Sequence, residues 1–303
     1  MTVVDDVHAV LPERALRAQD KARVLREALP WITRWADRTV VIKIGGSVGQ
    51  GETPGAMEAA FAADVALLRS VGLKVVVVHG GGPQISQLAD RLGLDSQFVD
   101  GRRVTDRAML EAVRYVLLGQ VNPRLVGLIT QAGARAAGVA GTDAQLITAR
   151  QSDPALGFVG DIDAVDPSVL RSLLADDVVP VVATVARGTD GQDYNVNADT
   201  VAAAVASALA ADKLIYLTDV AGIYRHYSDR SSLISRATPA DLEAIVAAGG
   251  VTEGMLPKVE GCLEALCKGV ASAHILDGSI PHALLVELLT EAGVGTMITE
   301  EEQ

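Results

Sequence analysis

The stretch Val75-Val76-Val77-Val78-His79-Gly80-Gly81-Gly82-Pro83 decides the fold class of this chain. Four consecutive valines, β-branched and apolar, are typical of a strand that is buried on both faces. Three glycines then expose backbone N–H groups without Cβ atoms in the way, and Pro83 suits the first turn of a following helix. Because a helix N-terminus adds positive potential, the stretch predicts a strand, an anion-binding turn and a helix.

A second stretch of this kind is Val40-Val41-Ile42-Lys43-Ile44-Gly45-Gly46-Ser47. Lys43 interrupts an otherwise apolar strand, where an ammonium group is costly to bury unless an anion meets it. Glycines can serve simply to make tight turns. A glycine triplet at one strand end, and a glycine pair beside a lysine at another, favour an anion site instead.

Apolar runs alternate with Ala- and Leu-rich segments along the whole chain. Strands are predicted at 40–44, 75–78, 178–185, 214–217 and 273–276, and helices at 13–29, 58–70, 106–118, 201–211 and 258–268. We expect Pro30 to end the first of these helices, and the polar segments 187–193 and 227–232 to form exposed loops or a hairpin. The alternation predicts an α/β fold with a mostly parallel central sheet sandwiched by helices.

Composition narrows the classes of function. The chain has 303 residues, is 49% hydrophobic, and carries 26 Lys and Arg against 38 Asp and Glu, a net charge of −12. This balance argues against a nucleic-acid partner. No apolar run reaches the roughly 18 residues of a membrane span, and the two cysteines, Cys262 and Cys267, fit a reducing compartment. We expect a cytoplasmic protein with no membrane partner and, since the five histidines do not cluster, no protein metal site.

Three further segments combine charged or amide side chains with helix starts. They are Asp100-Gly101-Arg102-Arg103-Val104-Thr105-Asp106, Tyr194-Asn195-Val196-Asn197-Ala198-Asp199 and Gly254-Met255-Leu256-Pro257-Lys258-Val259. The arginine pair suits a carboxylate, although a solvated basic turn is the alternative; Asn197 or Asp199 could simply cap a helix. Lys258 stands at the helix end that disfavours a cation, which a phosphate would explain. G-x-G-x-x-G, Walker and HExxH motifs are all absent.

Together these motifs resemble the series found in the amino-acid-kinase superfamily and, within it, the N-acetylglutamate kinases; the similarity covers residues 13–299. The resemblance implies ATP-dependent transfer of a phosphoryl group, with Mg²⁺, to the side-chain carboxylate of N-acetyl-L-glutamate in arginine biosynthesis. It also implies an N-terminal extension over 1–38 and a kinase domain over 39–303, divided into an acyl-glutamate lobe (39–198) and an ATP lobe (199–303).

The resemblance assigns roles to individual positions. Lys43, Lys258 and Asp199 match the catalytic residues, the lysines stabilising the transferring group and the aspartate organising them. The substrate-binding set is Gly81, Gly82, Arg103, Asn195 and Asn197, and the phosphate- and nucleotide-binding set is Gly45, Gly46, Thr218, Asp219, Gly222 and Tyr224. The chain departs from the family at Ser47-Val48-Gly49, where Asn-Ala-Met is frequent.

A second group of residues resembles the arginine-inhibited branch of the family, which assembles as hexamers through an N-terminal helix. The matching positions are Trp31, Lys213, His274, Glu287 and Gly295. The resemblance implies L-arginine as an effector, a homohexamer built as a trimer of dimers, and room for a PII-type signalling partner. For His274 alone, an ordinary histidine at a strand end is the alternative.

The chemistry of the residues agrees with acyl-phosphate formation. A side-chain carboxylate with a pKa of about 4.3 is already ionised at neutral pH and needs no general base. Cations and backbone donors must instead neutralise the charge of two approaching anions. Two alternatives remain: an aminoadipate-type kinase of lysine synthesis, and a non-catalytic nucleotide-sensing protein on the same fold.

Overall fold

The computed structural model describes the chain except residues 1–12, 46–54, 227–228, 252–253, 291–292 and 301–303, and the side chains of 13–18. The helices are α1 Glu13–Trp35, α2 Ala56–Ser70, α3 Gly82–Leu92, α4 Arg107–Val116, α5 Asn122–Gln131, α6 Ser168–Ala175, α7 Ala198–Leu209, α8 Pro239–Ala247, α9 Leu256–Cys267 and α10 Ala283–Leu289. The strands are β1 Thr39–Ile44, β2 Lys74–His79, β3 Phe98–Val99, β4 Arg102–Arg103, β5 Ala136–Ala140, β6 Ile147–Gln151, β7 Val159–Val165, β8 Val179–Ala183, β9 Val185–Gly188, β10 Asp193–Val196, β11 Lys213–Thr218, β12 Arg236–Ala237, β13 Ser272–Asp277 and β14 Thr296–Ile298.

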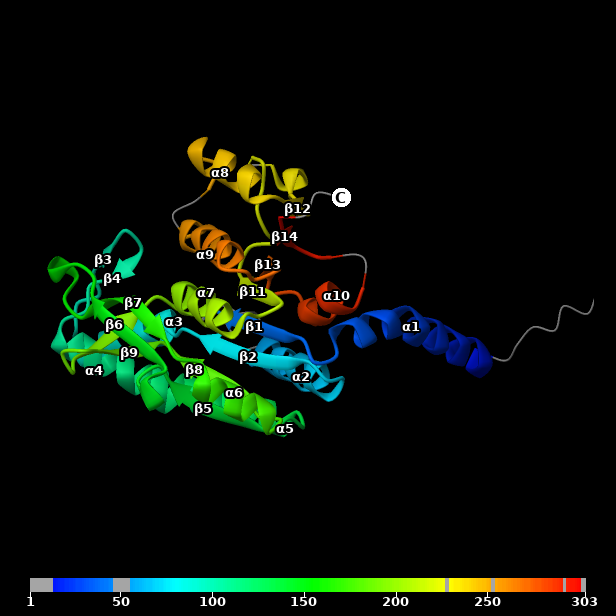
Figure 1. Ribbon diagram of the computed structural model, residues 1–303, viewed down its shortest axis with the longest axis horizontal. Helices are drawn as coiled ribbons and strands as arrows, with labels where there is room; N and C mark the ends of the chain where they lie inside the picture. Colours follow the sequence, from blue (N-terminus) through cyan, green and yellow to red (C-terminus); the bar gives the residue numbers. More distant parts are fainter. Residues whose placement is uncertain (1–12, 46–54, 227–228, 252–253, 291–292, 301–303) are drawn as a thin grey trace, which may run out of the picture.

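An eight-stranded sheet forms the centre of the molecule, in the order β12-β14-β13-β11-β1-β2-β8-β5. From β13 to β5 all neighbours are parallel, and β14 pairs with β13 in the antiparallel sense. Helices cover both faces (Figure 1). The predicted fold class is therefore confirmed.

Alternation along the strands builds two cores. Val40 and Ile42 of β1 belong to the core with α2, α5 and α10, whereas Val41 belongs to the core with α6, α7 and α9. Both faces of the parallel strands are buried, as the continuous apolar runs predict. Strands from both predicted lobes share this sheet, and the predicted boundary near residue 198 coincides with the start of α7.

A small closed barrel of β10, β7, β6 and β9 lies beyond one end of the sheet. The prediction of a single strand over 178–185 is wrong here, because the chain leaves the sheet after Ala183 and enters the barrel at Val185. Both halves of the run are apolar and buried, so composition does not reveal the change of partner. The polar segment 187–193 is the predicted hairpin, closed by antiparallel pairing of β9 with β10.

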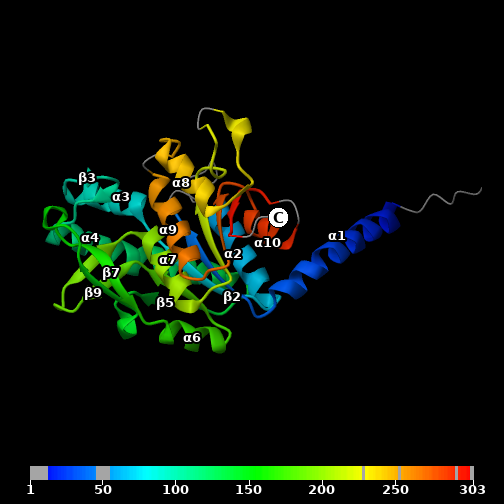
Figure 2. The same cartoon turned by 45° about the horizontal axis from the view of Figure 1, so that its top comes forward.

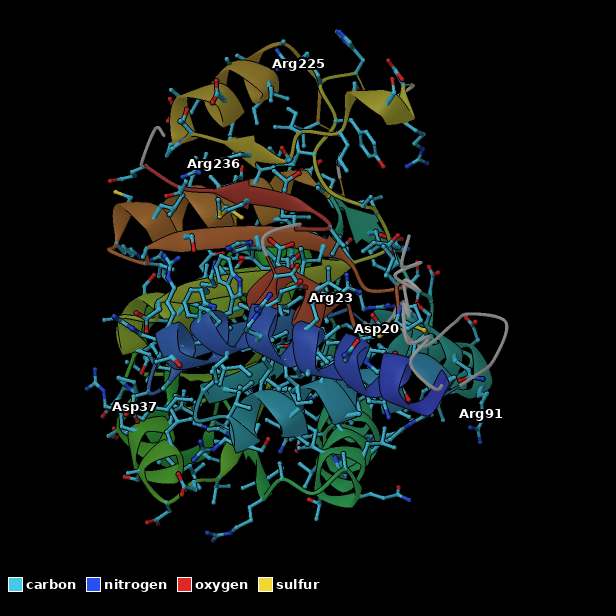
Figure 3. All side chains as sticks on the ribbon, turned by 90° about the vertical axis from the view of Figure 1, so that its right-hand side faces the viewer. Asp20, Arg23, Asp37, Arg91, Arg225 and Arg236 are labelled. Atoms are coloured by element: carbon cyan, nitrogen blue, oxygen red, sulfur yellow. The ribbon has the colours of Figure 1, made fainter. Side chains whose placement is uncertain are left out.

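Helix α1 extends away from the rest of the molecule in both views (Figures 1 and 2). The expectation that Pro30 ends it is wrong: the helix continues to Trp35, whose buried indole donates a hydrogen bond of 2.8 Å to the Leu288 carbonyl. Tertiary packing thus outweighs the local cost of the proline. The exposed surface of α1 carries an ion pair of 3.1 Å between Asp20 and Arg23 (Figure 3).

The described residues contain neither a membrane-spanning helix nor a cluster of metal-binding side chains. No helix there is long and apolar enough to cross a membrane. No group of three or more His, Cys, Asp and Glu side chains in that part of the chain is arranged to hold a metal ion.

Candidate active site

The carboxyl ends of strands β1, β2 and β11 lie side by side at one edge of the central sheet. Strand β1 lies between β2 and β11 in parallel, so that Ile44 is paired with His79 on one side and with Leu217 on the other. Gly45 and the glycine triplet from Gly80 therefore follow the ends of β1 and β2, and Thr218 is the last residue of the adjacent β11. Ligands of open α/β sheets bind at such an edge.

A buried cluster of two lysines and one aspartate lies at this edge. Lys43 Nζ is 2.8 Å from Asp199 Oδ1, and Lys258 Nζ is 3.1 Å from Asp199 Oδ2. Each side chain comes from a different element: Lys43 from β1, Asp199 from the first turn of α7 and Lys258 from the first turn of α9. Lys258 also donates to the Gly254 carbonyl at 2.9 Å. The structure thus brings together two ammonium groups that are 215 positions apart (258 − 43) in the sequence.

The cluster has one more positive than negative charge. Burial acts to raise the pKa of Asp199, but the charges of Lys43 and Lys258 outweigh it and hold that pKa below its usual value. The carboxylate is therefore ionised at neutral pH, and it neutralises only one of the two ammonium groups. A buried excess cation favours an anionic ligand beside it.

Backbone and aromatic groups fix the position of Asp199. The Tyr216 hydroxyl, fully buried on β11, donates a hydrogen bond of 3.0 Å to the Asp199 carbonyl oxygen. A Cβ atom at Gly261 of α9 would overlap that hydroxyl, which explains why a glycine stands there. Sequence reasoning missed Tyr216, because a tyrosine in the apolar run 214–217 gives no sign of what its hydroxyl contacts.

A cavity of about 320 Å³ opens beside the cluster. Its volume lies in the range of small-molecule sites. Its walls include eight of the predicted residues, namely Lys43, Gly45, Gly81, Gly82, Arg103, Asn195, Asn197 and Asp199. Lys258 does not line the cavity, but its ammonium group contacts Asp199, which does. Gly46 and the departure at 47–49 lie outside the described residues.

Arg103 is held rigidly in the cavity wall. Its guanidinium donates to Ser96 Oγ and Ser86 Oγ, both at 2.8 Å, and to the Gly82 carbonyl at 3.1 Å. The ring of Phe98 lies 4.6 Å away, across the β3–β4 hairpin. Burial lowers the pKa of Arg103, and the carboxylate of Asp90 opposes that shift. The solvated-turn alternative is therefore wrong for Arg103, which is only 7% exposed.

The two asparagines of the third segment have different neighbours. Asn197 is the N-cap of α7, because its side-chain oxygen accepts from the N–H groups of Asp199 at 2.8 Å and Thr200 at 3.3 Å. Asn195 lies two residues earlier, on strand β10, and donates to Thr105 Oγ1 at 3.2 Å. Both amides line the cavity while making these contacts.

Of the residues predicted to bind the nucleotide, Gly45 lies in the cavity wall, whereas Thr218, Asp219, Gly222 and Tyr224 do not. Thr218, the last residue of β11, and Asp219 share a hydrogen bond of 3.1 Å. Gly222 has φ of 152°, and a Cβ atom there would meet Thr296 of β14. Ile223 N–H donates to Thr296 Oγ1 at 2.8 Å, so β14 holds this loop in place. Tyr224 contacts the Arg230 side chain.

A second buried charged cluster lies at the opposite end of β11. Lys213 Nζ is 2.6 Å from His274 Nε2, and His274 Nδ1 is 2.6 Å from Glu287 Oε1. Glu287 Oε2 accepts from the Val294 N–H at 2.9 Å, next to Gly295. The ring that faces the Lys213 ammonium, at 4.8 Å, belongs to Trp35. Trp31, one helical turn earlier, is half-buried, and its ring contacts Arg34.

The second cluster is electrically balanced. Burial lowers the pKa of His274 to about 4, so the imidazole is neutral at pH 7. Burial also lowers the pKa of Lys213 to about 8, and hydrogen bonding to His274 keeps the pKa of Glu287 below its usual value despite burial. A neutral ring thus bridges an ammonium and a carboxylate. Trp35 was missed in the sequence; its signal was its position four residues after Trp31 on one helix.

Comparison with known proteins shows the family of this chain. The model of the amino acid kinase family matches residues 38–277. The chain belongs to the amino acid kinase family. An acetylglutamate kinase of Acaryochloris marina is 47% identical over 283 residues, which are 93% of this chain and 99% of that protein.

Among solved structures, an N-acetylglutamate synthase of Neisseria gonorrhoeae has a fold similar to that of this chain. Its complex with coenzyme A and N-acetyl-glutamate has a TM-score of 0.81 and 26% identity, covering 93% of this chain and 64% of the synthase. Its complex with coenzyme A and L-arginine has a TM-score of 0.77 and 27% identity, covering 92% and 65%. This amino acid kinase therefore spans about two thirds of that longer protein.

Proposed function

We propose that this amino acid kinase transfers the γ-phosphoryl group of ATP to the side-chain carboxylate of N-acetyl-L-glutamate, giving N-acetyl-L-glutamyl 5-phosphate for arginine biosynthesis. The observation that carries the proposal is the buried carboxylate of Asp199 between Lys43 and Lys258, beside a cavity lined by glycine N–H groups. The 47% identity to an acetylglutamate kinase supports the choice of substrate.

The transfer needs no general base, since the attacking carboxylate is ionised at neutral pH. Its obstacle is repulsion between that carboxylate and the triphosphate. Lys43 and Lys258 neutralise the transferring group, and Asp199 keeps both ammonium groups directed at it. Mg²⁺ enters with the nucleotide, as part of the substrate. The backbone N–H groups of Gly45, Gly46, Gly81 and Gly82 bind phosphoryl and carboxylate oxygens.

The acyl-glutamate lies against the barrel side of the cavity in this proposal. Arg103, already aligned by Ser86 and Ser96, binds its α-carboxylate in a bidentate pair. Asn195 and Asn197 bind the amide and the backbone of the substrate. Thr218, Asp219, Gly222 and Tyr224 bind the nucleotide from the β11 side.

A substrate panel tests the activity. Purified chain is incubated with MgATP and either N-acetyl-L-glutamate, free L-glutamate or 2-aminoadipate with a blocked amine, and ADP release is followed by a coupled assay. We expect turnover with N-acetyl-L-glutamate and at least tenfold lower kcat/KM with the other acids. The reason is that Arg103, Asn195 and Asn197 are proposed to bind a five-carbon acid whose amine is acylated. Preference for the aminoadipate compound, or no ADP release with any acid, would overturn the proposal.

The second cluster is the proposed site for feedback by L-arginine, formed by Lys213, His274, Glu287 and Gly295 with Trp31 from α1. Support comes from the balanced ion pair, to which the α-carboxylate and the guanidinium of one arginine are complementary. The Neisseria synthase of the same fold has been solved with L-arginine. Unchanged turnover at millimolar arginine would overturn this part of the proposal.

Helix α1 is the proposed contact between subunits of a homohexamer assembled as a trimer of dimers. Val24, Leu25 and Leu29 are 59%, 67% and 59% exposed on it, and a second copy of the helix would cover them. A monomer by light scattering would contradict this. A PII-type signalling partner and the cytoplasmic location stay predictions.

A further inference from the structure

His79 is a buried titratable residue that the proposed chemistry does not use. It ends β2, immediately before the glycine triplet, and is 1% exposed. Its ring makes two polar contacts: Nδ1 lies 3.0 Å from the Gly80 carbonyl oxygen, and Nε2 lies 3.0 Å from Asn122 Nδ2. Burial lowers its pKa to about 4, so the ring is neutral at pH 7 and carries one proton.

Asn122 determines which ring nitrogen carries that proton. Its Nδ2 is also 2.8 Å from the Val181 carbonyl oxygen, so this atom must be the amide nitrogen, since an oxygen there would face another acceptor. One N–H donates to Val181 and the other to His79. His79 Nε2 is therefore an acceptor, and the proton lies on Nδ1, which donates to the Gly80 carbonyl.

The position of the Gly80 carbonyl determines the direction of the next N–H. In a trans peptide unit the C=O and N–H groups point in opposite directions, and the described residues contain no cis peptide bond. Holding the Gly80 oxygen toward the His79 ring turns the Gly81 N–H away from that ring, and Gly81 is one of the residues that line the cavity. No acceptor among the described residues takes that N–H.

A second contact restricts the same glycine. Leu117 begins a π-helical turn, Leu117–Val121, that leads directly into Asn122 and α5. A Cβ atom at Gly81 would lie 2.8 Å from Leu117 Cδ2. One helical segment thus packs against Gly81 through Leu117 and orients His79 through Asn122.

We propose that His79, in its Nδ1–H tautomer set by Asn122, is a positioning residue that aims the Gly81 N–H at the anionic group in the cavity. The proposal rests on the proposed function, because that group is the phosphoryl or carboxylate oxygen of the reaction. His79 touches no reacting atom. Its effect is to orient the Gly81 N–H before the substrate binds, so that no reorganisation is needed at the moment of transfer.

Two substitutions separate this role from simple packing. His79→Leu removes the donor to Gly80, whereas His79→Asn places an amide N–H where Nδ1–H was. We expect His79→Leu to lower kcat by about 100-fold, the scale of one lost oxyanion donor, with KM for both substrates changed less than about threefold. His79→Asn should recover most of the loss. A kcat within twofold of the unsubstituted enzyme in His79→Leu, or equal losses in the two variants, overturns the proposal.

A spectroscopic measurement on the unsubstituted protein covers the case in which His79→Leu fails to fold. Long-range ¹H–¹⁵N NMR spectra report which ring nitrogen of a neutral histidine carries the proton. We expect Nδ1–H for His79, and the Nε2–H tautomer would overturn the proposal. If the unsubstituted chain releases no ADP, the proposed function fails while this spectrum still tests the tautomer; if it is active and His79→Leu is equally active, only the positioning role fails.

Discussion

The two buried charged clusters at opposite ends of β11 differ in their charge balance. Lys43, Asp199 and Lys258 place two cations on one anion, at the wall of a cavity. Lys213, His274 and Glu287 place one cation and one anion on either side of a neutral ring. Burial disfavours charge in both clusters, but only the first cluster keeps a charge that no neighbouring side chain neutralises. This difference indicates that the first cluster requires an anionic ligand. The second cluster has no excess charge for such an anion to neutralise.

The largest effect should follow from breaking the first cluster. Lys43→Ala or Lys258→Ala removes a cation that stabilises the transferring group, and we expect kcat to fall about 1,000-fold or more, as for other charge-neutralising groups in phosphoryl transfer. Steady-state assays with N-acetyl-L-glutamate and MgATP measure the effect.

The matched control is Lys268→Ala, at the C-cap of the helix that carries Lys258 but half-exposed and paired with Glu264 at 2.6 Å. An exposed i,i+4 pair contributes little, so its turnover should stay unchanged. Near-normal kcat in Lys43→Ala would contradict the catalytic assignment.

Acid should disrupt the second cluster before the first. The pKa of His274 is about 4 in the folded chain and 6.5 when exposed, so the unfolded chain takes up a proton first as the pH falls. The stability from the neutral ring is complete above pH 6.5 and is lost down to pH 4, by up to about 3 kcal/mol. The pKa of Asp199 is shifted below 3.8, so its contribution is lost only at lower pH.

Urea unfolding at pH 7 and pH 4.5 measures this loss, with His274→Gln as the comparison. His79, with a pKa of about 4, titrates in the same range. The substitution should therefore remove roughly half of the loss due to these two histidines, each contributing on the same scale. An equal drop in stability in both proteins would show that His274 does not titrate in this way.

The sequence predicts the parallel centre of the fold well, since strands buried on both faces have continuous apolar runs, such as 75–78. The barrel is different: β7 has half-exposed and exposed residues in its second half, and β9 continues the apolar run of β8 without a break. The helix predicted over 106–118 also ends too early, because the π turn Leu117–Val121 carries the chain from α4 into α5. Residue patterns alone do not reveal such a widened turn.

Residues of the candidate site could be predicted where a side chain is of a type that its predicted position disfavours. Lys43 within an apolar strand and Lys258 at the disfavoured end of a helix both attract attention, and the structure joins them through Asp199. Tyr216 and Asn122 could not be found this way, because a buried hydroxyl or amide has many uses. Their roles depend on which carbonyl lies opposite, and that is determined only by the packing of distant elements.

The smallest effect is expected for a substitution in the second cluster, the one formed by Lys213, His274 and Glu287. Glu287→Gln removes the anion of the balanced pair while keeping the size of the side chain. If the cluster binds L-arginine, the lost charge-assisted hydrogen bond, worth about 1.5 kcal/mol or more, should raise the arginine concentration for half-inhibition at least tenfold. The matched control is Glu264→Gln, an exposed carboxylate on α9 that pairs with Lys268. Inhibition curves at saturating MgATP measure both. If the two variants respond to arginine alike, the balanced cluster is a structural ion pair, and the charge difference between the clusters reflects packing alone.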